Sequence, residues 1–165
     1  MRPAALSLLL LLPAACGKKT PPAPKTVEYS APGGRFSVTL PADWRVDEAP
    51  GDDRLASFLG PGAGQQAELI TVSFFAAGGR WKSPLEYASW RVTAGRAESP
   101  AAADPAGVAR VSVRLKRQTP DLGAVERRLR LAALPASGGF FVVEDYTDPS
   151  REGDSLDAFL SSFHP

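Results

Sequence analysis

Cysteine and histidine are nearly absent from this chain of 165 residues, since each occurs once, as Cys16 and His164. A single cysteine forms no disulfide within its own chain, and zinc and copper sites in proteins need clusters of cysteine or histidine ligands. A Ser-His-Asp triad would depend on a histidine next to the last residue of the sequence, where chains fray. We therefore expect no disulfide, no metal site, no cofactor and no triad enzyme.

An excess of charge of one sign is also missing. The chain carries 19 Lys and Arg residues against 18 Asp and Glu residues, a formal net charge of +1. Without a strong positive field, the sequence predicts no nucleic-acid partner. Its length suits one domain, which buries enough surface to fold without a disulfide or a structural metal.

Long hydrophobic runs are lacking except at the start of the chain, where residues 4–12 include five consecutive leucines. This stretch is shorter than the roughly 20 apolar residues that cross a membrane as a helix. Arg2 precedes it, and Lys18 and Lys19 follow closely. A charged start followed by a short apolar centre is typical of a secretory signal peptide.

The sequence LPAACG at residues 12–17 resembles the lipobox of bacterial lipoproteins, in which small residues precede a cysteine that is acylated. Pro13 departs from the leucine that is usual there. The resemblance implies that Cys16 becomes a lipidated N-terminus, which holds the protein on the lipid bilayer. Gly17 stands where aspartate marks retention in the inner membrane, so we expect the periplasmic face of the cell envelope, with the outer membrane favoured. A plain secretory signal that leaves a free thiol is the alternative.

Three segments follow from these patterns. Residues 1–15 are expected to be the signal peptide, and residues 16–32 the lipidated N-terminus with a flexible tether, because this stretch contains four prolines and no apolar periodicity. Residues 33–165 are expected to form the globular domain.

Alternating apolar and polar residues predict antiparallel strands in the globular domain. The expected strands are 36–40, 54–59, 68–76, 107–117, 124–134 and 140–147. The sequence SPLE at residues 83–86 is typical of a helix start, and a second helix is expected near the end of the chain. Residues 97–106 are expected to be a mobile connection. The fold class is thus α+β, an antiparallel sheet of about six strands packed by helices.

The order of these elements resembles the PsbP, Mog and DcrB-like fold over about residues 29–163. Phe36, Leu40, Pro41 and Trp44 match the opening strand and turn of that family, while its closing helix is matched by residues 156–163. The resemblance implies an α/β/α sandwich and a small non-enzymatic domain that binds or stabilises protein partners, sometimes as a lipoprotein. It implies no catalytic residue.

A basic face is the one asymmetric feature of the expected domain. Residues 107–134 contain seven basic residues against two acidic ones, and alternation places several of them on one side of a hairpin. The face consists of Arg110, Arg114, Lys116, Arg128 and Arg130. It is a candidate site for an anionic partner such as lipid headgroups, a cell-wall polymer or an acidic protein. The alternative is an exposed face that its charges keep soluble.

Carboxylates offer two further alternatives. A pair drawn from Asp43, Asp47, Glu144 and Asp145 would suit an envelope hydrolase. Calcium is the other, because acidic residues gather near the end of the chain without the spacing of an EF-hand; these are Glu144, Asp145, Asp148, Glu152, Asp154 and Asp157. The leading hypothesis remains a membrane-anchored, non-catalytic binding or assembly module of the cell envelope, whose protein or polymer partner the sequence does not identify.

Overall fold

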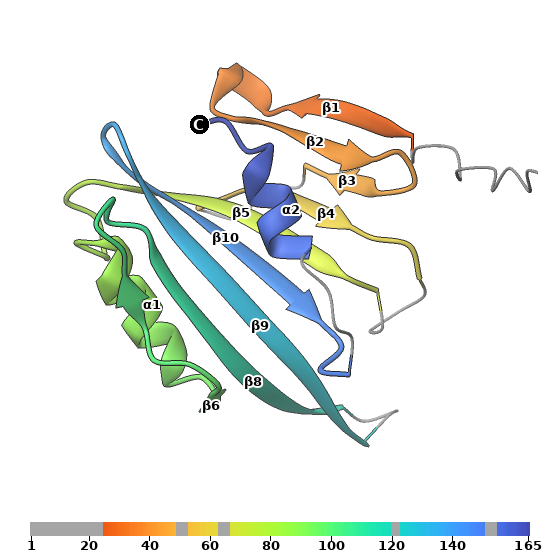
Figure 1. Ribbon diagram of the computed structural model, residues 1–165, viewed down its shortest axis with the longest axis vertical. Coiled ribbons are helices and arrows are strands. Elements are labelled where there is room, and N and C mark those ends of the chain that lie inside the picture. Colours follow the sequence, from red (N-terminus) through yellow and green to blue (C-terminus); the bar gives the residue numbers. More distant parts are fainter. Residues whose placement is uncertain (1–24, 49–52, 63–66, 120–122, 151–154) are drawn as a thin grey trace, which may run out of the picture.

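A computed structural model describes residues 25–48, 53–62, 67–119, 123–150 and 155–165, and every structural statement below concerns these residues (Figure 1). The expected signal peptide and Cys16 lie outside them. The strands are β1 (Thr26–Ser30), β2 (Ser37–Pro41), β3 (Arg45–Asp47), β4 (Arg54–Leu59), β5 (Leu69–Ala76), β6 (Arg96–Ala97), β7 (Ala102–Ala103), β8 (Ala109–Thr119), β9 (Gly123–Ala136) and β10 (Gly139–Thr147). The helices are α1 (Pro84–Val92), α2 (Ser155–Ser161) and the 3-10 turn η1 (Pro32–Gly34).

The main sheet has eight antiparallel strands in the order β3-β4-β5-β10-β9-β8-β6, and β7 also pairs with β8. The expected α+β class is therefore confirmed, and the six predicted strands correspond to β2, β4, β5, β8, β9 and β10. Five of the six lie in this sheet, whereas β2 pairs with β1 in a separate hairpin. Of the long strands, β8 alternates in the sequence, whereas β10 is a run buried on both faces.

The two faces of the sheet are covered by different elements. On one face, α2 and the β1–β2 hairpin cover an aromatic core that includes Phe58, Phe141 and Phe159, and Figure 1 shows α2 lying across this face. On the other face, α1 packs on β8 and β9 over a core that includes Val113 and Leu129. We call these the α2 face and the α1 face.

The start of α1 follows the expected capping pattern. The Ser83 hydroxyl accepts a hydrogen bond from the Glu86 amide at 3.2 Å, and the Glu86 carboxylate accepts one from the Lys82 amide at 2.7 Å. Pro84 occupies the first turn, where its missing N–H costs no hydrogen bond. These contacts fix the residue at which α1 begins.

The tether predicted for residues 16–32 is wrong from Thr26 onward. Residues 26–30 form β1, which pairs with β2 over five residues, and the Tyr29 ring lies 5.2 Å from that of Phe58. Ala31 is only 4% exposed. The four prolines dominated the sequence pattern, and the short alternation around Tyr29 was too brief to predict a strand. The globular domain therefore begins about seven residues earlier than expected.

The mobile connection predicted for residues 97–106 is also wrong. Ala97 lies in β6, and Ala102 and Ala103 form β7; both strands pair with β8. The Asp104 carboxylate then accepts hydrogen bonds from the amides of Ala106 and Val108 at 2.9 and 3.0 Å. Small residues and proline do suggest a loop, but here pairing with β8 satisfies the backbone instead.

Candidate binding groove

Helix α1 covers only part of its face of the sheet. Beyond it, a groove of about 370 Å³ lies between β8 and β9 on one side and β4 and β5 on the other. Leu59, Leu69 and Tyr146 are paired across neighbouring strands, and Tyr146 is paired in turn with the core residue Leu129. Residues paired across strands share a face, so the groove opens on the α1 face. Its lining consists of Leu59, Ala67, Leu69, Arg117, Val125, Arg127 and Tyr146.

Arg127 closes one end of the groove. Its Nη2 donates hydrogen bonds to the backbone carbonyls of Ala67 at 2.8 Å and Tyr146 at 2.5 Å. The side chain thus reaches from β9 to the residues that lead into β5. Its Nε is buried and has no hydrogen-bond acceptor among the described residues. Burial lowers the pKa of Arg127, although the charge of Asp148 opposes this shift.

The guanidinium of Arg127 is unusual because main-chain carbonyls hold it, rather than a carboxylate. The structure shows no ion pair between Arg127 and any described carboxylate within 4.0 Å. Arg117, the second cation of the groove, likewise pairs with none of them and is exposed. The groove therefore combines apolar walls with two positive charges that form no ion pair within the described residues, although the charges of Asp148, Asp145 and Glu68 act on Arg127 from a greater distance.

Two hydrogen bonds and a neighbouring ion pair hold Tyr146, the aromatic residue of the groove. The Tyr146 hydroxyl donates to Glu144 Oε2 at 2.7 Å and accepts from Arg91 Nη2 at 2.7 Å. Tyr87 of α1 donates to Glu144 Oε1 at 2.9 Å, and Arg91 Nε lies 2.7 Å from the same oxygen. This network fastens the end of α1 to β10 beside the groove.

The electrostatics of this network keep both tyrosines neutral. Burial and the negative charge of Glu144 raise the pKa of Tyr87 and of Tyr146 well above the ordinary value. Burial acts against the charge of Arg91, but Glu144, Tyr146 and Tyr87 together outweigh it, so the pKa of Arg91 is raised. One cation, one anion and two neutral phenols thus form a fixed polar unit, which orients the Tyr146 ring.

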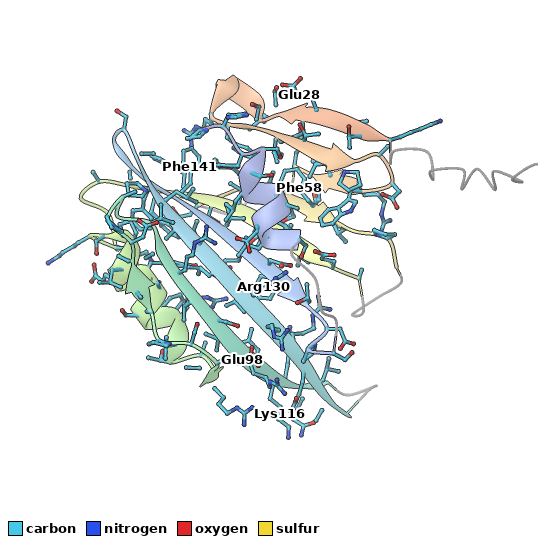
Figure 2. All side chains as sticks on the ribbon, viewed as in Figure 1. Glu28, Phe58, Glu98, Lys116, Arg130 and Phe141 are labelled. Carbon is cyan, nitrogen blue, oxygen red and sulfur yellow. The ribbon has the colours of Figure 1, made fainter. Side chains whose placement is uncertain are left out.

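The predicted basic face lies on the α2 face of β8 and β9, opposite the groove, and its charges are largely engaged within the chain. Glu98 binds two of its members: its Oε1 lies 2.7 Å from Arg114 Nη2, and its Oε2 lies 2.9 Å from Arg128 Nε. Burial opposes ionisation of Glu98, but hydrogen bonds from Arg114 and Ser112 lower its pKa. Lys116 makes no ion pair with a described residue. Figure 2 shows Glu98, Lys116 and Arg130 along these two strands.

The remaining two members of the basic face hold α2 against the sheet. Arg130 Nη2 donates to Asp145 Oδ2 at 2.7 Å and to the hydroxyl of Ser155, the first residue of α2, at 2.7 Å. Arg110 pairs with Asp157 of α2 at 3.0 Å on the surface. Binding of an anionic partner on this face stays a prediction, and such a partner would compete with the chain's own carboxylates.

Among the carboxylates proposed for a hydrolase, the structure separates Glu144 from both Asp145 and Asp47. Glu144 and Asp145 are successive residues of β10, so their side chains lie on opposite faces. Asp47 and Glu144 share a face but lie on strands three pairings apart, β3 and β10, or roughly 14 Å at about 4.8 Å per strand. Asp43 lies in the exposed turn after β2.

Metal sites and membrane spans were also predicted to be absent. Within the described segments, no group of three or more His, Cys, Asp or Glu side chains is arranged to hold a metal ion. Glu152 and Asp154 of the acidic cluster lie outside those segments. Neither α1 nor α2 has the length and apolar character of a membrane-crossing helix.

Arg117 and Arg127 are two of the seven basic residues of the long hairpin, but the sequence patterns did not predict the groove. A signal was present in the alternation of the strands. Arg127 lies at the same parity as Val125 and Leu129, and Arg117 at the same parity as Leu115, so both arginines occupy positions where the pattern expects apolar residues. A cation at a core-facing position is the mark that would have singled them out.

Comparison with known proteins gives the fold. No family model matches the chain, and no curated protein matches it in sequence. Among solved structures, the Ran-binding protein Mog1p of Saccharomyces cerevisiae matches with a TM-score of 0.53 and 12% identity, over 86% of this chain and 96% of that one. Cyanobacterial PsbP (CyanoP) of Synechocystis sp. PCC 6803 matches with a TM-score of 0.54 and 13% identity, over 92% and 98%.

A third structure comes from Bacteroides thetaiotaomicron VPI-5482, with a TM-score of 0.56 and 12% identity. The match covers 83% of this chain and 47% of that one, so this chain spans about half the length of that structure. Together these structures define the class of the domain. It has the PsbP/Mog-like fold, as the resemblance implied.

Proposed function

We propose that this protein is a lipid-anchored, non-catalytic binding module of a bacterial cell envelope, and that it recognises its partner through the groove on the α1 face. The observation that carries the proposal is Arg127, a partly buried guanidinium that main-chain carbonyls hold in place at the end of an apolar groove. A charged side chain that is fixed before any ligand arrives is what a binding site requires, because little freedom is lost on association.

The anchoring part of the proposal rests on the sequence. An apolar leader ends at a lipobox-like LPAACG, and the only cysteine of the chain lies in that motif. Acylation of Cys16 would hold the domain at the bilayer. Residues 17–25 separate it from β1, a stretch of about 28 Å when extended at about 3.1 Å per residue. The bilayer is thus the first partner, and the outer membrane is the favoured location.

The neighbours with this fold support a binding role by analogy. One of them is described as a Ran-binding protein, which is a property of that protein and not of this chain. The fold hosts binding in at least that relative, and the present chain offers a different feature, the arginine-lined groove, at which binding would occur.

Photo-crosslinking in the producing cells tests the binding role. A benzophenone side chain placed at Val125 faces the groove and leaves both arginines in place, whereas the same group at Glu126, the next residue of β9, faces the opposite side of the sheet. The proposal predicts discrete adducts from position 125 and none of the same mass from position 126. Identical adduct patterns at both positions, or none at position 125, would contradict it.

A further inference from the structure

The size of the groove favours a small ligand. Its volume of about 370 Å³ falls within the roughly 300 to 1,000 Å³ of small-molecule sites in proteins. Such sites are mostly apolar and contain a few polar groups that orient the ligand. The groove meets this description, because Leu59, Leu69 and Val125 supply apolar surface and the two guanidiniums supply the polar groups.

The polar groups of the groove select an anion. Arginine has only hydrogen-bond donors and is always charged, so both cationic groups of the groove call for acceptors. Arg127 Nη2 already donates to two main-chain carbonyls and its Nε is buried, so Arg127 attracts a ligand anion through its charge. Arg117 is exposed, and its guanidinium donates directly to the ligand oxygens.

The apolar part of the groove favours a ligand with an apolar tail. Tyr146 presents a ring whose hydroxyl is already bonded to Glu144 and Arg91, so the phenol offers no free donor and its ring acts as an apolar wall. Leu59 and Leu69 extend this surface towards the edge of the sheet. An anionic head beside Arg127 would therefore continue into an apolar tail along β4 and β5.

We infer that the groove binds a carboxylate-headed amphiphile of the fatty-acid class, with the carboxylate between Arg117 and Arg127 and the acyl chain against Leu59, Leu69 and the Tyr146 ring. The inference deepens the proposed function, because it names the ligand class of the same groove. It does not depend on the lipid anchor.

Calorimetric titration of the full chain carrying Cys16→Ser tests this inference, since that substitution removes the anchor and alters no residue of the groove. Decanoate is the probe. We expect a Kd below about 1 mM. Decanol, which has the same tail without the charge, should bind at least about tenfold more weakly, because a hydrogen bond to a charged group is lost. Acetate, which has the charge without the tail, should not bind.

Variants locate the site. Arg117→Gln and Arg127→Gln should each weaken decanoate binding about tenfold or more. Lys116→Gln, which removes a neighbouring cation on the opposite face of β8, should leave it unchanged. Arg127→Lys keeps the charge, so it should bind decanoate more tightly than Arg127→Gln does. If Arg127→Gln prevents folding, the affinity of Arg117→Gln for decanoate and the comparison with decanol still test whether the groove binds the carboxylate.

Three outcomes would overturn the inference. They are no binding of decanoate, equal affinity for decanol, and equal losses in Lys116→Gln and Arg117→Gln, which would reveal general surface charge. These titrations use a chain without the anchor. A negative result would therefore overturn the ligand class only, while membrane attachment and the crosslinked partner have their own tests.

Discussion

Replacement of Arg130 by methionine should destabilise the domain strongly, although sequence analysis assigned this residue to a partner-binding face. Asp145 is fully buried, and Arg130 donates to its Oδ2 through Nε at 3.2 Å and Nη2 at 2.7 Å. Removing one member of a buried ion pair leaves an uncompensated charge and costs about 3 to 5 kcal/mol. The Ser155 hydroxyl still donates to Asp145 at 2.9 Å, so we expect the lower end of that range.

The assay is thermal unfolding followed by circular dichroism as a function of pH. A loss of about 3 kcal/mol lowers the Tm of a domain of this size by roughly 6 to 12 °C at pH 7. Burial already raises the pKa of Asp145 in the folded protein, and losing Arg130 raises it further. The folded pKa of Asp145 thus lies above the unfolded value of about 3.9. The loss of stability caused by the unpaired Asp145 carboxylate is complete above this folded pKa, and it fades as the pH falls and the carboxylate takes up a proton.

The Tm difference between Arg130→Met and the parent chain should therefore shrink between pH 7 and pH 4. Adding Asp145→Asn to Arg130→Met removes the stranded charge and should recover most of the loss at pH 7. Lys116→Met is the matched control, a cation on the same face without an ion pair to a described residue. An unchanged Tm for Arg130→Met at pH 7, or a difference that stays constant with pH, would refute the structural role of this ion pair.

Three further predictions concern other polar contacts. Glu98→Gln should cost about 1 kcal/mol at pH 7; because the folded pKa of Glu98 is lowered, this loss should disappear in urea titrations as the pH falls below about 4, and a loss independent of pH would count against it. Ultraviolet titration should show Tyr87 and Tyr146 resisting ionisation above pH 10 until the chain unfolds, since the pKa of each is raised; ordinary titration of all tyrosines would contradict the buried network. Ser83→Ala should lower the unfolding free energy by about 1 kcal/mol, measured by urea denaturation, whereas no change would mean that the cap at 3.2 Å contributes nothing.

The central strands could be predicted from the sequence because their pattern is local. Alternation in β8 and β9 and the apolar run of β10 mark residues that face a core, and the capping residues before α1 mark its start. Elements whose stability comes from distant partners were missed. β1 is stabilised by pairing with β2 and by the packing of Tyr29 on Phe58 of β4. The sequence of residues 26–30 alone does not predict either contact.

The candidate site shows the same division. The charges of the long hairpin are visible in the sequence, but their partners are not. The pattern favours a free basic face, whereas Glu98, from a segment expected to be mobile, binds Arg114 and Arg128. The groove was missed because its walls come from β4, β5, β8 and β9, and only the fold brings these strands around Arg127.

The most direct test of the account is the intact mass of the protein isolated from the membranes of its producing cells. Lipid attachment predicts a chain that begins at Cys16, with the mass of residues 16–165 increased by acyl and glyceryl groups on that residue, and recovery in the detergent phase. A chain recovered in the aqueous phase with an unmodified Cys16 thiol would contradict a membrane-anchored binding module.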